Sequence, residues 1–194
     1  MENIISRIKS KSSELFSFFK VLILHPRSIG ALCPSSSYLA NAMAEHIQLK
    51  PGEIVVELGS GAGVITEALL KHGCPPNQIV AVEFMPAFAE KLRTRFPNIT
   101  TIEGNAIDLV KLLSPYPGVK YVVSSLPLRS LPVELSKGIL EQIEKILPSN
   151  GYYIQFTYSY KHDTFGLLPN FKRIHAKRIW RNLPPARVDV RVKA

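Results

Sequence analysis

The chain has 194 residues, 46% of them hydrophobic, which suits one soluble globular domain with a sound core. Lysine and arginine outnumber aspartate and glutamate by 24 to 15, and the formal charge of +9 favours a polyanionic partner such as nucleic acid or an anionic membrane surface. Two cysteines and five scattered histidines show no redox or metal spacing, so we expect no metal, and no apolar run approaches the ~20 residues that cross a bilayer.

The first 50 residues precede the first predicted strand and form a region of their own. Apolar residues recur at helical spacing between residues 4 and 22, opposite Lys, Arg and Ser, which predicts a basic amphipathic helix. Lys20 interrupts the apolar core of a signal peptide, so we expect none. A second predicted helix begins near Ser35 and Ser36, whose hydroxyl and N–H groups suit an anion, either a lipid phosphate or a cofactor carboxylate; a plain helix cap is the alternative.

From residue 51 onward, strand patterns alternate with helix patterns. The predicted strands are 53–58, 78–83, 99–104, 120–125 and 151–158, and the predicted helices are 63–73, 86–96 and 132–147. This alternation predicts βαβ units and a mostly parallel sheet. Segments 171–180 and 186–192 flank a Pro-containing turn with no helix between them, which predicts an antiparallel C-terminal hairpin with one solvated face. We therefore expect an α/β, Rossmann-like fold with seven strands and an N-terminal helical extension.

The turn after the first predicted strand is rich in glycine and follows Glu57. Its residues are Gly59, Ser60, Gly61, Ala62 and Gly63. Glycine is tolerated there where φ is positive or where a ligand approaches the backbone closely. A dinucleotide fingerprint would have Gly or Ala where this chain has Val64, and it requires no acid two residues before the first glycine. The pattern E-x-G-x-G-x-G instead resembles the first motif of class I S-adenosylmethionine-dependent methyltransferases.

That resemblance implies S-adenosyl-L-methionine as the cofactor, with the glycine turn under its methionine part and Glu57 near its ammonium group. Glu83, at the end of the second predicted strand, is placed to accept both ribose hydroxyls. Asn105 and Ala106 would contact the adenine, and Phe84 would pack on the adenine ring. At position 105 the family more often has Asp. The predicted cofactor contacts are Ser35, Ser36, Glu57, Gly59, Ser60, Gly61, Gly63, Glu83, Phe84, Asn105, Ala106 and Ser124.

The segment after the fourth predicted strand lies where a methyl acceptor would meet the cofactor. Adenine-N6 methyltransferases, including the ribosomal RNA dimethylases, carry a polar–x–Pro–aromatic signature there, whose ring stacks on the target base. The backbone carbonyls here can hold an amine, but Leu128 offers no stacking platform, which counts against nucleic acid. Phe156, Tyr158 and Tyr160 alternate on one strand face, either to cradle a methylated cation or as a plain core face. The predicted catalytic residues are Ser125, Leu126, Pro127 and Tyr158.

Four segments, residues 29–40, 124–132, 155–158 and 182–188, together resemble the bacterial phospholipid N-methyltransferase family. The resemblance implies methylation of phosphatidylethanolamine towards phosphatidylcholine by a cytoplasmic enzyme held peripherally at the inner face of the cytoplasmic membrane. The N-terminal helix would bind the anionic membrane surface, unless it packs on its own domain. Three alternatives stay open: a nucleic-acid adenine-N6 methyltransferase, an enzyme for another amino lipid such as ornithine lipid, and a cofactor-binding protein without catalysis.

The sequence also predicts a division of the chain into two parts. Residues 1–50 would form the amphipathic helix and a helical lid, and residues 51–194 the methyltransferase domain.

Overall fold

The structure is a computed structural model that describes residues 36–158 and 168–194. These residues belong to one compact unit, which begins at Ser35. The predicted N-terminal amphipathic helix and Ser35 itself lie outside the described residues, as does Tyr160. Helix α2 (Ser37–Ala44), which the sequence interpretation assigned to the region of residues 1–50, packs within this unit and buries Leu39 and Met43 completely.

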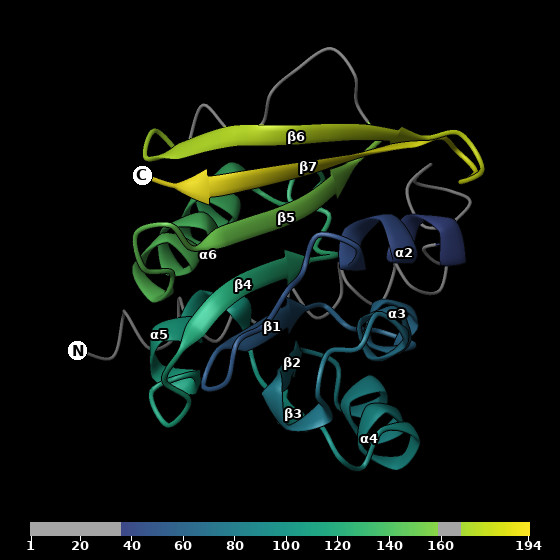
Figure 1. The fold of residues 1–194 in the computed structure, drawn as a ribbon. Coiled ribbons are helices and arrows are strands. Elements are labelled where there is room, and N and C mark those ends of the chain that lie inside the picture. Colours follow the sequence, from purple (N-terminus) through teal and green to yellow (C-terminus); the bar gives the residue numbers. More distant parts are fainter. Residues whose placement is uncertain (1–35, 159–167) are drawn as a thin grey trace. The chain divides into compact units, whose positions relative to one another are not determined.

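The described strands form one mixed sheet in the order β3-β2-β1-β4-β5-β7-β6 (Figure 1). They are β1 (Ile54–Leu58), β2 (Ile79–Glu83), β3 (Thr100–Glu103), β4 (Val119–Ser124), β5 (Tyr152–Thr157), β6 (Phe171–Ile179) and β7 (Ala186–Lys193). Strands β1 to β5 are parallel, whereas β7 lies antiparallel between β5 and β6. The predicted Rossmann-like sheet of seven strands with an antiparallel C-terminal hairpin is therefore confirmed. The predicted solvated face of the hairpin is wrong for β7, which lies inside the sheet and buries Asp189 and Arg191.

Helices cover both faces of the sheet, as expected for a fold built from βαβ units (Figure 1). Besides α2 they are α3 (Val64–Lys71), α4 (Pro86–Arg95), α5 (Leu109–Leu112) and α6 (Val133–Ile146), with short 3₁₀ turns η1 (Pro76–Gln78) and η2 (Ala106–Asp108). Helix α4 begins with Pro86 at a position where the missing N–H costs nothing. Helix α6 buries Ile139 and Ile143, whereas Leu135 and Ile146 are only partly buried.

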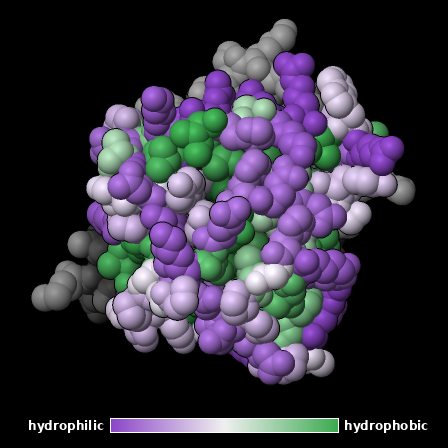
Figure 2. All heavy atoms as spheres, in the orientation of Figure 1, coloured by the Kyte–Doolittle hydropathy of each residue, from purple (hydrophilic) through white to green (hydrophobic). Residues whose placement is uncertain are grey.

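The core follows from the alternation of side chains along the strands. Strand residues such as Val55, Ala81 and Ile154 share one buried cluster with residues of α2 and α3. The visible outer surface is mostly hydrophilic, with small separate hydrophobic patches (Figure 2). Within the described residues, no helix combines the length and the apolar character needed to cross a membrane.

Candidate functional site

Backbone hydrogen bonds join the loops that follow the parallel strands. The Gly59 amide donates to the Val82 carbonyl at 3.0 Å, and the Ser125 amide donates to the Leu58 carbonyl at 2.9 Å. The glycine turn after β1, the end of β2 and the loop after β4 are thereby held at one edge of the sheet. This is the edge at which open parallel α/β sheets bind their ligands.

The three glycines of the turn have different structural roles. Their φ angles of +73°, +51° and +79° at Gly59, Gly61 and Gly63 all lie in the left-handed region. A Cβ atom at Gly59 would lie 2.8 Å from Leu126 Cδ2, and one at Gly63 would lie 2.5 Å from Phe96 Cε2, so a side chain at either position would displace its neighbour. At Gly61 the nearest described atom would be the Gly59 carbonyl oxygen at 4.0 Å. The turn therefore leaves open space beside Gly61.

Glu57 lies fully buried at the end of β1, next to this turn. Its Oε2 accepts a hydrogen bond from the Thr66 hydroxyl of α3 at 2.6 Å. Among the described residues, no group makes a hydrogen bond of good geometry with the buried Glu57 Oε1 or the buried Ser60 Oγ, although the Ser60 hydroxyl lies close enough to the Glu57 carboxyl to oppose the rise of its pKa. Burial raises the pKa of the Glu57 carboxyl from 4.5 to about 7, an effect that the Thr66 hydroxyl opposes and the nearby Glu83 charge adds to.

The raised pKa of Glu57 predicts pH-dependent cofactor binding. If the ionised carboxylate receives the cofactor ammonium, affinity should rise with pH by up to about tenfold per unit below pH 7 and then level off. Binding at pH 6 should release a proton, which calorimetry in buffers of different ionisation enthalpy would detect. Glu57→Gln should flatten both effects; an unchanged pH dependence in that variant would contradict the assignment.

The raised pKa of Glu57 also determines the direction in which the stability of the protein changes with pH. Folded Glu57 holds its proton up to about pH 7, whereas an unfolded chain releases it near 4.5. Between these values the folded state binds more protons, so the stability of the ligand-free protein should fall as the pH rises through this window.

Glu83, at the end of β2, is held in place by the backbone around it. Its Oε2 accepts from the Gly61 amide at 2.8 Å and its Oε1 accepts from the Met85 amide at 2.9 Å. The side chain is only 6% exposed. A carboxylate oxygen can accept more than one hydrogen bond, so these contacts leave capacity for ribose hydroxyls. Glu83 therefore fixes the conformation of the glycine turn in addition to its predicted ribose contact.

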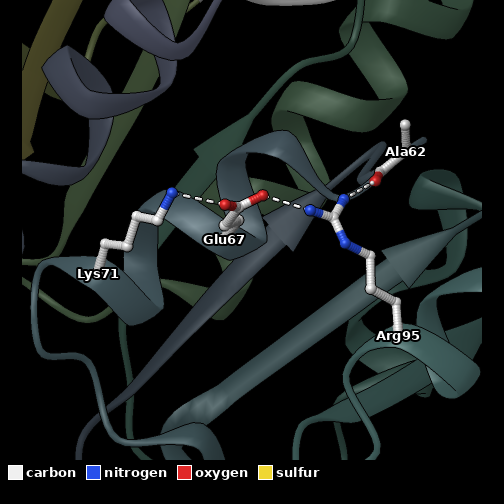
Figure 3. A network of polar contacts seen from close by, with 4 residues as sticks. All are labelled: Ala62, Glu67, Lys71 and Arg95. Atoms are coloured by element: carbon white, nitrogen blue, oxygen red, sulfur yellow. Dashed lines mark hydrogen bonds and ion pairs between the residues drawn. The ribbon is translucent and has the colours of Figure 1, made fainter.

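Arg95 of α4 contacts the glycine turn through the Ala62 carbonyl (Figure 3). Its Nη1 donates to the Ala62 carbonyl at 2.7 Å, and its Nη2 pairs with Glu67 of α3. Glu67 also accepts from Lys71 Nζ at 2.5 Å, and this contact is the main cause that lowers the Glu67 pKa. No sequence pattern indicated this role of Arg95, because nothing in an ordinary basic helix shows that one cation turns towards a carbonyl 33 residues earlier.

The predicted adenine residues follow β3. Asn105 caps the turn η2, and its Oδ1 accepts from the Ile107 amide at 3.2 Å. Ala106 is buried, and Phe84 is partly buried just after β2. Register places the ends of β2 and β3 side by side, with Glu83 opposite Glu103. The structure thus brings Glu83 and Asn105 to neighbouring strand ends; their contacts with a nucleoside stay a prediction.

Hydrogen bonds with Ser124 and with Ser136 of α6 hold the loop after β4 in place. The Leu126 amide donates to Ser124 Oγ at 3.2 Å, and Ser136 Oγ of α6 donates to the Leu128 carbonyl at 2.6 Å. Leu126 and Leu128 are buried, whereas Ser125 and Pro127 are partly exposed. Because the Leu128 side chain is buried, this position presents no surface on which a base could stack.

Gln155 of β5 contacts the loop after β4, a role that the sequence interpretation did not include. Its Nε2 donates to the Leu126 carbonyl at 3.1 Å, and its Oε1 accepts from the Tyr153 hydroxyl at 2.8 Å. The Leu126 carbonyl also accepts from the Leu128 amide at 2.9 Å. A buried amide inside an otherwise apolar strand was the available signal, since such a group needs partners.

The other predicted residues have mainly structural contacts. Ser36 is the N-cap of α2: its Oγ accepts from the Leu39 amide at 3.3 Å, and its own amide donates to Asn182 Oδ1 at 3.0 Å. The ring of Tyr158 packs edge-on against Phe156 with centroids 5.4 Å apart. Phe156 belongs to the hydrophobic core cluster. An anion at Ser36 and a cation at Tyr158 stay predictions.

The residues at this edge fit S-adenosylmethionine in chemical terms. The buried Glu57 Oε1 suits an ammonium group, the open side of Gly61 suits a chain that passes close to the backbone, and Glu83 suits a ribose. Within residues 36–158 and 168–194, no three His, Cys, Asp or Glu side chains gather in a way that could hold a metal ion.

Comparison with known proteins identifies relatives of two kinds. A family model described as ribosomal RNA adenine dimethylase matches residues 35–143. An ornithine lipid N-methyltransferase from Singulisphaera acidiphila is 32% identical over 150 residues, which cover 74% of this chain and 78% of that protein. A probable ribosomal RNA small subunit methyltransferase A from Methanosarcina acetivorans is 35% identical over 80 residues, or 41% of this chain and 28% of that protein.

Solved structures share the fold at low sequence identity. A Burkholderia thailandensis 1,6-didemethyltoxoflavin-N1-methyltransferase, solved with S-adenosylhomocysteine, superposes with a TM-score of 0.69 at 15% identity, covering 96% of this chain and 90% of that one. TrmN from Thermus thermophilus has a TM-score of 0.65 at 21% identity, covering 80% of this chain and 48% of that one.

Proposed function

This chain belongs to the ribosomal RNA adenine dimethylase family of S-adenosylmethionine-dependent methyltransferases, and within that family we propose that it N-methylates the amine of a membrane-lipid headgroup. S-adenosylmethionine is its cofactor and, when bound, supplies an electrophilic methyl group on a sulfonium. One observation carries the proposal: the lipid-modifying relative matches over 78% of its own length. The chain spans less than a third of the ribosomal relatives that it matches.

Nucleic acid is the second candidate acceptor, and the family match and the charge of +9 favour it. Against it stands the loop after β4, where Leu128 is buried and occupies the place of the expected aromatic ring. Adenine on a flipped nucleotide is usually held by stacking as well as by hydrogen bonds. A lipid amine on a flexible headgroup needs only the hydrogen bonds, so the loop fits the lipid better.

The loop can hold an amine through its backbone. The Leu126 carbonyl already accepts bonds from Gln155 Nε2 and the Leu128 amide, and the Pro127 carbonyl accepts one from the Ser130 amide at 2.8 Å. The Ser125 carbonyl is therefore the best candidate, and the Pro127 carbonyl with its second lone pair is the next. Arg129 is the one ionisable side chain in residues 124–130, and it is no general base. A primary ammonium has a pKa of about 10, which burial lowers, so these carbonyls would orient the neutral amine for in-line attack.

Two headgroups are consistent with this chemistry. The sequence resemblance favours phosphatidylethanolamine on the route to phosphatidylcholine, whereas the relative in Singulisphaera acidiphila acts on ornithine lipid. Both carry a primary amine, which the loop carbonyls would treat alike.

A lipid substrate places the enzyme at a membrane. We propose that it is cytoplasmic and binds peripherally to the inner face of the cytoplasmic membrane. Residues 1–50 would contribute the basic amphipathic contact with anionic lipid, and residues 51–194 the catalytic domain, against which α2 packs.

A substrate panel tests the proposal. Purified protein with S-adenosylmethionine is incubated with vesicles that contain either phosphatidylethanolamine or ornithine lipid, and mass spectrometry follows successive additions of a methyl group. We expect methylation of at least one lipid, and loss of it in Gly61→Arg. Absence of methylated product with both lipids, in a protein that binds the cofactor, would contradict the proposal.

A further inference from the structure

Two large apolar side chains protrude from the turn that joins β6 to β7. We call residues 180–185 the hairpin turn. Leu183 is 79% exposed and Trp180 is 69% exposed, which makes them the two most exposed large hydrophobic side chains of the described residues. Single exposed apolar residues are common on protein surfaces. A tryptophan and a leucine three residues apart on one protruding turn are a more specific arrangement.

The hairpin turn is anchored to α2. Asn182 is 2% exposed, and its Oδ1 accepts from the Ser36 amide at 3.0 Å, while its Nδ2 donates to the Pro184 carbonyl at 2.8 Å. The Arg181 guanidinium lies over the ring of Tyr38, 5.2 Å from its centroid. The residues before and after Asn182 are thus fixed by a buried side chain. Trp180 and Leu183 are therefore exposed because the backbone of the hairpin turn holds them outward.

The strand that leads into the turn is basic. Seven consecutive residues of β6, from Lys172 to Arg178, are exposed, and β6 is an edge strand of the sheet. Between Phe171 and Val188 the chain has no carboxylate, and its cations are Lys172, Arg173, Lys177, Arg178, Arg181 and Arg187. Lys177 pairs with Glu45, and Arg173 and Arg187 both lie within ion-pair distance of the buried Asp189. Six cations thus face two carboxylates, and the surroundings of the apolar turn remain positive in sum.

The hairpin turn lies at the same edge of the sheet as the candidate site. Strand β7 is antiparallel to β5 and pairs its Arg187 with Thr157, the last residue of β5. Ile179 of β6 pairs with Ala186 of β7, so the chain reverses just beyond that point. In Figure 1 the arrowheads of β4 and β5 point to the side on which β6 turns into β7. A surface that meets the turn would therefore also face the edge that carries the acceptor loop.

We propose that the hairpin turn is a membrane-contact site that inserts Trp180 and Leu183 into the interfacial layer of an anionic bilayer, with the cations of β6 near its headgroups. Tryptophan prefers the membrane interface, and leucine enters the acyl region. RNA would also attract the cations, but it offers an exposed leucine nothing to bind. The proposal rests on the proposed function, since a lipid substrate gives the enzyme a reason to orient this edge towards a membrane.

The chain offers a direct probe, because Trp180 is its one tryptophan. Vesicles of phosphatidylglycerol and phosphatidylcholine, which contain no amino lipid, are added to the full-length protein. We expect the Trp180 emission to shift to the blue and to be quenched by brominated acyl chains, with both effects weakened by salt. Vesicles of phosphatidylcholine alone should give much smaller changes. This signal reports on the turn itself, even if residues 1–50 also hold the protein on the vesicle.

Substitution at the tip gives the second readout. Leu183→Glu should abolish the blue shift and weaken vesicle binding in flotation on the order of tenfold, because a carboxylate cannot enter the apolar layer and is repelled by anionic lipid. Cofactor affinity should stay unchanged. Val110→Glu on α5 is the matched control, since Val110 is 46% exposed but lies on another element, and it should bind vesicles like the parent.

Four results would overturn the proposal. They are no blue shift with anionic vesicles, vesicle binding by Leu183→Glu equal to the parent, a blue shift on adding RNA but not vesicles, or a lower oligomeric mass of Leu183→Glu in light scattering. The last would identify the turn as a contact between copies of the chain. Because these vesicles contain no substrate, the two proposals are tested separately. Insertion of Trp180 into them, together with no methylated product in the substrate panel, would contradict the proposed function and leave this contact standing.

Discussion

Gly61→Arg is expected to lower the affinity for S-adenosylmethionine by at least about a hundredfold in a protein that remains folded. An added Cβ at this position meets no described atom closer than 4.0 Å, so the long side chain would extend into the open space beside the turn. A non-glycine residue at φ of +51° costs about 1–2 kcal/mol, which a folded domain can tolerate. Isothermal calorimetry measures the affinity, and circular dichroism reports whether the fold persists.

Gly61→Ala separates the effect of backbone strain from the effect of a side chain that blocks the cofactor. It has the same unfavourable φ but fills little space, so most of the cofactor affinity should remain. If Gly61→Arg binds as tightly as the parent, the open side of the turn is not where the cofactor lies.

The second large effect is expected for Glu83→Ala. This change removes the predicted ribose contact and also leaves the amides of Gly61 and Met85 without their acceptor. Loss of charge-assisted hydrogen bonds of this kind costs about 1.5–3 kcal/mol, or roughly 10- to 150-fold in affinity. Calorimetric titration with S-adenosylhomocysteine gives the total loss.

An analogue that lacks both ribose hydroxyls divides this loss into its two causes. If Glu83 contacts the ribose, the variant and the parent should differ much less for the dideoxy analogue than for the natural ligand. An equal loss for both ligands would show that Glu83 acts only by fixing the glycine turn.

Local patterns in the sequence were sufficient to predict the sheet and its closing hairpin. Apolar strands that alternate with amphipathic helices have few other ways to pack, and the final two strands have no helix between them. The sequence did not indicate that β7 lies between β5 and β6, because strand order is a property of the whole sheet. Helix α5 was missed, since four residues carry too little periodicity to be recognised.

The candidate site was predictable where its residues follow strand ends. Glu57 and Glu83 lie at the ends of buried strands, and Asn105 follows the partly buried strand β3. Parallel strands bring such positions to one edge of the sheet. The contacts that hold the site were not predictable. Glu83 reaches the Gly61 amide across 22 residues, and Asn182 reaches Ser36 across 146, so both depend on packing that no local pattern encodes.

A competition experiment in one tube tests the proposed acceptor most directly. The protein receives S-adenosylmethionine with a labelled methyl group, vesicles of total bacterial lipid and deproteinised total RNA, and solvent extraction then separates lipid from RNA. We predict that the label enters the organic phase and migrates on chromatography with N-methylated amino lipids. Label that remains in the aqueous phase with RNA would contradict lipid methylation and support an RNA methyltransferase.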